Sequence, residues 1–332
     1  MSSNPNKSQE DFDTVDNLLK LLVNDDTALE TAREHLEIDT EKSKAFQPEL
    51  KVKKNSPLND STATKGAIGF FNARSRRYRH RLFEKRMRRN PDSFVIVSEG
   101  DSWFQYPVFV KDVIDHLNEI DEFAIRSFGF GGDWLSNILE ESEYINAIRW
   151  YNPKVFLISG GGNDIIGDNR LRVLLKRFDS TQADRAPANY LNEAFEKGMQ
   201  DLEFLYDRLF QRLTSEFPKL HIICHGYDYG LPGKEKPLVT GDWLENPMQD
   251  LGIEDKTLQR LIVKELIDRF NVMLSGLIQA KYANKNIHYL DCRGIVKDHE
   301  WYDELHPNSF GFLKVAEKFK QKIFEIRIKE GV

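Results

Sequence analysis

From residue 94 onward, short apolar runs alternate with segments of helical periodicity, and this alternation constrains the fold more than any other feature of the chain. Five runs rich in β-branched and aromatic residues have the length of buried strands: 94–99, 123–128, 155–159, 221–225 and 287–291. Helical patterns lie between or after them at 108–119, 134–149, 189–215, 256–282 and 309–328. Such alternation is typical of a parallel sheet covered by helices on both faces, with right-handed crossovers. We therefore expect an α/β fold with five parallel strands.

The composition is that of a globular protein with a sizeable core. The chain has 332 residues, of which 40% are hydrophobic and 30% charged, and its net charge of −6 gives no general attraction to nucleic acid. Its two cysteines, Cys224 and Cys292, both fall in or beside predicted strands, which fits a reducing compartment better than a disulfide framework. The first residues lack the apolar stretch of a signal peptide, and no run approaches the roughly 20 apolar residues of a membrane span. We expect a cytoplasmic protein whose substrate is intracellular or lies at the inner face of a membrane.

Residues 1–93 differ from the rest and are expected to form a helical and linker extension, while residues 94–332 are expected to form the main domain. Residues 10–41 contain eleven Asp or Glu but only two Lys or Arg, and apolar residues recur at helical spacing between Val15 and Leu22. Residues 42–66 have little periodicity and are typical of a linker. This extension is a candidate module for recruiting a protein partner, nucleic acid or membrane, and the sequence does not predict an oligomeric state.

A strongly basic segment, 74–89, closes the extension with nine Lys or Arg and one Glu. It could contact anionic lipid or nucleic acid, since each phosphate contact adds affinity. The alternative is a basic helix that lies against the acidic N-terminal segment or faces solvent. Its only aromatic residues are Tyr78 and Phe83, too few for a platform that stacks single-stranded bases. Nucleic acid is therefore the weaker expectation.

Polar residues with catalytic chemistry follow the predicted strands. Gly100-Asp101-Ser102 comes after the first strand, and residues 129–134 and 160–164 follow the next two. Asp303-Glu304-Leu305-His306 precedes the last helix. Parallel sheets present ligand sites at the carboxyl ends of their strands, so we expect these segments to converge on one edge.

Acyl transfer requires a nucleophile, a base that takes its proton, a group that orients the base, and donors for the oxyanion. Ser102 can be the nucleophile and His306 the base, with Asp303 three residues earlier as the orienting group. Oxyanion donors can come from the backbone N–H groups of Ser102 and Gly132 and from the side-chain amide of Asn163. Each residue alone also has an ordinary structural interpretation, as a turn, a helix cap or a loop histidine.

Taken in order, the four segments resemble the sequence blocks of the SGNH hydrolases, also called GDSL-type esterases and lipases. The matching residues are Gly100-Asp101-Ser102, Gly131-Gly132-Asp133, Gly161-Gly162-Asn163-Asp164 and Asp303-Glu304-Leu305-His306. The resemblance covers roughly residues 94–328. It implies a three-layer α/β/α sandwich with a flavodoxin-like, five-stranded parallel sheet. It also implies the catalytic roles just described for Ser102, Asp303, His306, Gly132 and Asn163.

Two departures from the family pattern concern the substrate and the oxyanion donors. Trp103 replaces the usual leucine beside the nucleophile, which should affect packing and substrate shape more than chemistry. Gly131 stands where the family has serine, which leaves open which glycine N–H is the donor. The long connections 164–200 and 229–256 should flank the site, and their basic residues could meet an anionic head group or face solvent.

Other motifs do not change this interpretation. His221, His225 and His288 lie in or at the ends of strands and are expected to be structural, while 299–303 resembles a zinc helix motif but ends in Asp rather than His. The sequence has no phosphate-binding glycine motif and no Gly-x-Ser-x-Gly elbow. We therefore predict a serine hydrolase of carboxylic esters that needs no cofactor or metal. The alternative is a recruited, lipid-directed effector whose N-terminal module binds a protein, nucleic acid or membrane partner.

Overall fold

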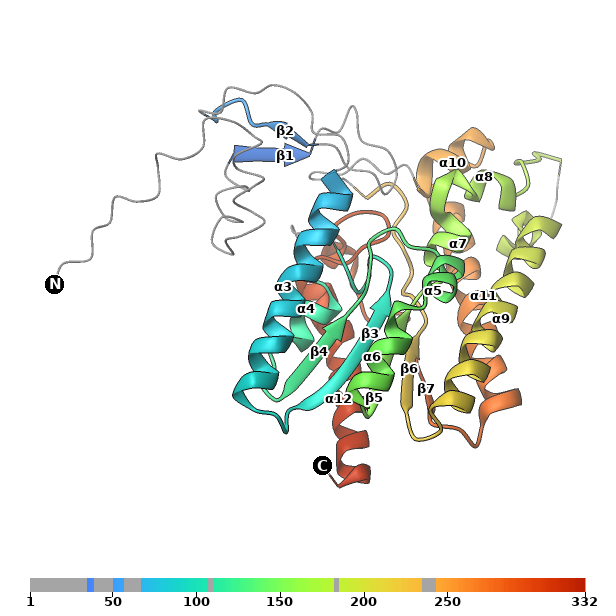
Figure 1. The fold of residues 1–332 in the computed structure, drawn as a ribbon. Helices are drawn as coiled ribbons and strands as arrows, with labels where there is room; N and C mark the ends of the chain where they lie inside the picture. The colour runs from blue at the N-terminus through green and yellow to red at the C-terminus, as the bar shows by residue number, and fades with distance from the viewer. Residues whose placement is uncertain are drawn as a thin grey trace.

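The computed structural model describes residues 35–38, 50–56, 67–106, 110–181, 185–234 and 243–331. At its centre lies a parallel sheet with the strand order β4-β3-β5-β6-β7 (Figure 1). The strands are β3 (Phe94–Gly100), β4 (Phe123–Ser127), β5 (Val155–Ser159), β6 (His221–His225) and β7 (Ile287–Leu290). Their residues are mostly buried because helices cover both faces of the sheet. The five-stranded parallel sheet expected from the sequence is confirmed.

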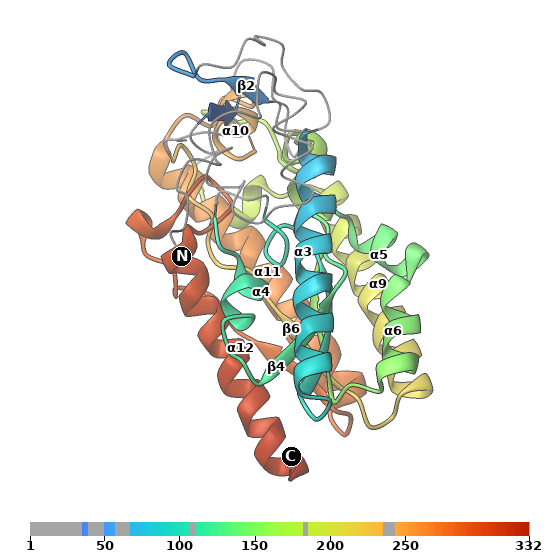
Figure 2. The same cartoon turned by 60° about the vertical axis from the view of Figure 1, so that its left-hand side comes forward.

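Helices form a layer on each side of this sheet (Figures 1 and 2). One layer contains α4 (Val113–Leu117) and α12 (Ser309–Glu330). The other contains α5 (Leu135–Glu141), α6 (Glu143–Tyr151), α9 (Glu193–Glu216) and α11 (Lys256–Tyr282). Side-chain caps from Asn192, Asp255 and Asn308 start the three longest helices of these two layers, α9, α11 and α12. The single helix expected over 134–149 is instead two, because Ser142 between them adopts a left-handed backbone with φ of 48°.

The strand order places a topological switch point beside β3. The chain runs from β3 to β4 on one side and then crosses to β5 on the other. Gly100, the last residue of β3, pairs with Ser159, the last residue of β5. The segments that follow these two strands carry Ser102 and Asn163, so both leave the sheet at neighbouring points of the same edge. Crevices at such switch points are the usual ligand sites of doubly wound sheets.

Helix α3 (Ala67–Arg89) runs along the outer strand β4, as Figure 2 shows. One face of this basic helix packs on the fold: Arg79 is 1% exposed, and half-buried Arg86 donates to the Phe123 carbonyl over 2.7 Å. Helix α3 thus packs against the α/β fold. The sequence had instead suggested contact with an anionic partner, with the acidic N-terminal segment or with solvent. Other cations face solvent, namely Arg77, Arg81, Lys85, Arg88 and Arg89. Their contact with an anionic partner stays a prediction, as does the domain boundary at residue 93.

The described part of the N-terminal region contains a small antiparallel ladder. Strand β1 (Leu36–Ile38) pairs with β2 (Leu50–Val52), where the sequence suggested helix and linker. Three-residue strands give too short an alternation to stand out from sequence. The helix expected between Val15 and Leu22 lies outside the described residues. In the described parts of the chain, no helix combines the length and apolar character that crossing a membrane requires.

Candidate active site

Three side chains that are far apart in the sequence form one line of hydrogen bonds. Ser102 Oγ lies 2.7 Å from His306 Nε2, and His306 Nδ1 lies 2.9 Å from each carboxylate oxygen of Asp303. All three are buried, with exposures of 6%, 3% and 1% for Ser102, His306 and Asp303. The structure therefore brings together the residues expected as nucleophile, base and orienting group. Their spacing meets the geometric requirement for proton transfer from the hydroxyl to the imidazole.

The Asp303 carboxylate is held by donors other than His306. Its Oδ1 accepts the backbone N–H groups of Leu305, at 2.8 Å, and of His306, at 2.7 Å. The phenol of Tyr106 donates to Oδ2 over 3.0 Å, and burial together with this carboxylate raises the pKa of Tyr106. These bonds fix the orientation of the carboxylate and, through it, that of the imidazole ring.

The nucleophile turn is organised by Asp101, the residue before the serine. Its Oδ1 accepts Ser159 Oγ at 2.7 Å and the backbone N–H of Trp103 at 3.1 Å. Only glycine fits at position 100, since a Cβ there would lie 2.8 Å from Ser159 Cβ. The hydrogen bonds of Asp101 thus hold the turn in place. The close approach of β3 to β5 explains why a glycine stands at position 100.

Asn163 lies beside the candidate nucleophile and lines the same pocket as Ser102 and His306. Its Nδ2 donates one hydrogen to the Asp133 carbonyl over 2.6 Å, so the second amide hydrogen is left for another acceptor. The next residue, Asp164, accepts the Leu135 N–H at 2.9 Å, and burial raises the pKa of Asp164 to about 6. Two hydrogen bonds therefore hold residues 163–164 against residues 133–135.

Gly132 lies in the loop that follows β4 but is not among the residues that line the pocket. Its φ of 88° requires glycine. Its neighbour Gly131 donates its N–H to Asn72 Oδ1 over 3.0 Å, so helix α3 braces this loop. The loop reaches Asn163 through the Asp133 carbonyl. The role of Gly132 as an oxyanion donor stays a prediction.

Tyr227 is a site residue that the sequence analysis missed. Its hydroxyl donates to Asp101 Oδ2 over 2.5 Å and accepts the Gly162 N–H at 3.1 Å. It therefore links the turn that carries Ser102 to the segment that carries Asn163, and burial raises its pKa well above the ordinary tyrosine value. Its position two residues beyond the strand 221–225 was a usable signal, because the carboxyl ends of the strands meet at this edge.

Glu304 is a second residue to which the sequence analysis gave no role. Its carboxylate is 1% exposed and accepts four backbone N–H groups at 2.8–3.0 Å, from Gly233, Trp243, Leu244 and Glu245. Through these bonds the connection expected to flank the site is attached directly to the loop of the candidate base. Trp243 then meets the His306 ring edge-on, with centroids 5.7 Å apart.

Trp103 connects the turn that carries Ser102 to the loop that carries His306. It is 3% exposed, and its Nε1 donates to the Leu305 carbonyl over 3.2 Å. Its ring stacks on that of His225 at a centroid distance of 5.4 Å. The expectation that this residue acts through packing agrees with these contacts, and it also lines the pocket.

The three strand histidines and several cations of the first long connection have structural partners. His225 is buried, which lowers its pKa, and its Nδ1 lies 3.0 Å from the Gly226 carbonyl. His221 and His288 contact each other at 2.9 Å, away from the candidate site. Of the cations in the first long connection, Arg170 lies over the Trp134 ring, and Arg172 and Arg177 bond to Asp250.

No protein-family model matches the sequence, and no curated protein matches it. Solved structures do match. A family 3 carbohydrate esterase from Clostridium thermocellum shares 17% identity over 71% of this chain and 98% of its own, with a TM-score of 0.42. An extracellular lipase from Streptomyces rimosus shares 14% identity over 68% of this chain and 99% of its own, with a TM-score of 0.45.

A third structure, described as a GDSL-like lipase from Bacteroides ovatus, shares 15% identity over 71% of this chain and 54% of its own, with a TM-score of 0.42. All three matches bear names of esterases or lipases, the class whose sequence blocks the chain resembles.

Proposed function

We propose that the protein is a serine hydrolase of carboxylic esters that works through an acyl-enzyme on Ser102. The observation that carries this proposal is the continuous line of hydrogen bonds from Ser102 through His306 to Asp303. A serine hydroxyl is a weak nucleophile unless an adjacent base takes its proton, and the imidazole Nε2 is positioned to do so.

In the first half-reaction, Ser102 Oγ attacks the ester carbonyl carbon while His306 Nε2 takes the hydroxyl proton. The tetrahedral intermediate then expels the alcohol, which receives that proton from His306. In the second half-reaction, water gives a proton to His306 and attacks the acyl-enzyme, and Ser102 recovers its proton when the carboxylic acid leaves. Asp303 holds the imidazole in the tautomer that this exchange needs.

The negative oxygen of each tetrahedral intermediate needs donors that are in place beforehand. We assign this task to the backbone N–H groups of Ser102 and Gly132 and to the second amide hydrogen of Asn163. The bond from Asn163 to the Asp133 carbonyl supports the assignment, because it fixes the amide beside the pocket. A donor fixed in this way needs no reorganisation when charge develops.

A fluorophosphonate probe tests the proposal, with hydrolysis of nitrophenyl esters as the parallel readout. Wild-type protein should be labelled on Ser102 and should hydrolyse at least one ester, whereas Ser102→Ala should do neither. Ser98→Ala is the matched control, since Ser98 lies on β3, the strand that leads to Ser102, and its buried hydroxyl makes no hydrogen bond among the described residues. Equal labelling of Ser102→Ala and wild type would refute the role of Ser102.

A further inference from the structure

An apolar face of helix α11 forms one wall of the pocket at Ser102. Val263, Leu266, Ile267 and Phe270 recur at positions i, i+3, i+4 and i+7, so they share one side of the helix, and all four line the pocket. Ile267 is 6% exposed, while Val272 on the opposite side of the helix is 62% exposed. The helix thus turns a continuous aliphatic and aromatic surface toward the candidate nucleophile.

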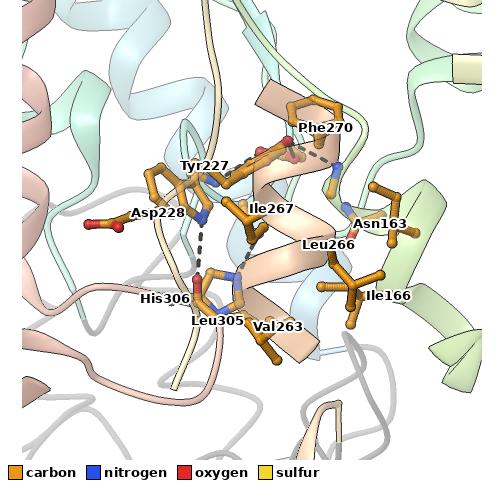
Figure 3. A pocket seen from close by; sticks show the side chains of 16 residues that line it. Asn163, Ile166, Tyr227, Asp228, Val263, Leu266, Ile267, Phe270, Leu305 and His306 are labelled. Carbon is orange, nitrogen blue, oxygen red and sulfur yellow. Dashed lines mark hydrogen bonds between the residues drawn. The ribbon is translucent and has the colours of Figure 1, made fainter. Parts of the chain in front are cut away.

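A second part of the wall comes from the short helix α7 (Gly162–Ile166), which also carries Asn163. Ile165 and Ile166 line the pocket two and three residues after the amide proposed to bind the oxyanion. Figure 3 shows Leu266 and Ile267 gathered between His306 on one side and Ile166 on the other. The pocket holds about 610 Å³ of empty space, part of it open to solvent.

Apart from the proposed catalytic groups of Ser102, Asn163 and His306, the polar side chains around this space are engaged by the protein. The Tyr227 hydroxyl is bonded to Asp101 and Gly162, and the Asp228 carboxylate accepts backbone N–H groups of Gly294 and Val296 at 2.6 and 2.7 Å. A sugar hydroxyl would lose its water at these walls without finding new partners, which costs free energy. An aliphatic chain makes no hydrogen bonds to water, so its burial at these walls would not carry this cost.

We propose that this pocket receives the acyl group of the ester, as an unbranched aliphatic chain longer than acetyl. The inference rests on the proposed function of Ser102. The leaving alcohol must take its proton from His306, so it departs on the side of that residue. The carbonyl oxygen faces the proposed donors at Ser102 and Asn163, so the acyl chain takes the remaining direction, along the apolar walls that α11 and α7 form.

Burial of a methylene group contributes about 0.8 kcal/mol, which corresponds to about a fourfold change in kcat/KM for each methylene that enters the pocket. We therefore expect kcat/KM to rise from nitrophenyl acetate through butanoate and hexanoate until the chain fills the pocket. A series of acetate esters with increasingly long alcohols should show no comparable rise. Equal or better hydrolysis of the acetate than of longer acyl esters would overturn the inference, and so would a preference that follows the alcohol.

A variant pair tests whether the α11 wall sets this preference. Ile267→Trp should shorten the pocket and lower the ratio of hexanoate to acetate kcat/KM at least tenfold, whereas Val272→Trp on the solvent side should leave the ratio unchanged. Thermal unfolding and fluorophosphonate labelling report whether each variant is folded with an intact nucleophile. Should Ile267→Trp not fold, Ile267→Ala replaces it, with the acyl optimum moving to a longer chain.

The outcomes separate the two proposals. Labelling of Ser102 and ester hydrolysis without an acyl-chain preference, or an unchanged ratio in a folded Ile267 variant, would refute the acyl pocket and leave the hydrolase standing. Absence of both labelling and hydrolysis in wild-type protein would refute the hydrolase and the acyl pocket with it.

Discussion

Replacing Arg79 by methionine tests whether helix α3 is a structural part of the fold. The Arg79 guanidinium donates to Asp112 Oδ2 over 2.6 Å, to the Phe104 carbonyl over 2.5 Å and to Gln105 Oε1 over 2.8 Å. Asp112 itself is fully buried. Removing one partner of a buried ion pair typically costs about 3–5 kcal/mol, because it leaves an uncompensated charge. Methionine keeps the apolar stem of the side chain, so the loss reports the charge and the hydrogen bonds.

This cost should depend on pH through Asp112. Burial raises the pKa of Asp112 from 3.8 to about 7, although Arg79 beside it acts in the opposite direction. Between these values the folded state retains a proton that the unfolded state has released, so this group makes the folded state less stable as pH rises from 3.8 to about 7. Without Arg79 the pKa rises further and the decline extends above pH 7. The stability difference between variant and wild type should therefore be larger at pH 8 than at pH 5.

Urea unfolding followed by tryptophan fluorescence measures both effects. Arg77→Met is the matched control, because Arg77 lies on the same helix and is exposed. It should change the free energy of unfolding by less than about 0.5 kcal/mol. An Arg79→Met protein that unfolds at the same urea concentration as wild type would refute the structural role of α3.

Three further variants probe the site and the core. Asp303→Asn should lower kcat by about 10⁴-fold with little change in circular dichroism, since it removes the group that selects the His306 tautomer; an unchanged kcat would contradict that role. Glu304→Gln replaces one acceptor oxygen by a donor, leaves two of the four N–H groups unpaired, and should lower the free energy of unfolding by about 2–4 kcal/mol in thermal or urea denaturation. Burial raises the pKa of Glu99 from 4.5 to about 8, so this group makes the folded state less stable as pH rises through that range. Glu99→Gln should flatten this part of the stability profile, and a slope equal to that of wild type would show that Glu99 does not titrate there.

The strands and the convergence of the site could be predicted because both depend on local patterns. Each strand is a short apolar run, and a parallel sheet places everything that follows such runs at one edge. The segments that carry Ser102 and His306 therefore lie together at one edge of the sheet, as the alternation of strands and helices predicted. Asp303 could be paired with His306 because three residues separate them within one loop.

Partners from distant parts of the chain could not be predicted in this way. Arg79 sits in a basic run, where composition favours solvent exposure, and only the packing of α3 beside β4 brings it to Asp112. Helical periodicity predicted the helix over 256–282. It could not tell whether the apolar face of that helix meets the core or a pocket, since both require apolar side chains.

The loop from Asp303 to His306 has a mechanical consequence for the candidate base. Its four residues are tied, in chain order, to Tyr106, to Gly233 and residues 243–245, to Trp103 and to Ser102. Moving the histidine would break several buried hydrogen bonds at once, so the loop has no inexpensive opening of its own. The backbone amides of Leu305 and His306, which donate to Asp303, should therefore be among the slowest to exchange with deuterium, at rates set by unfolding of the whole sheet. In this arrangement, the imidazole of His306 shares the rigidity of the core.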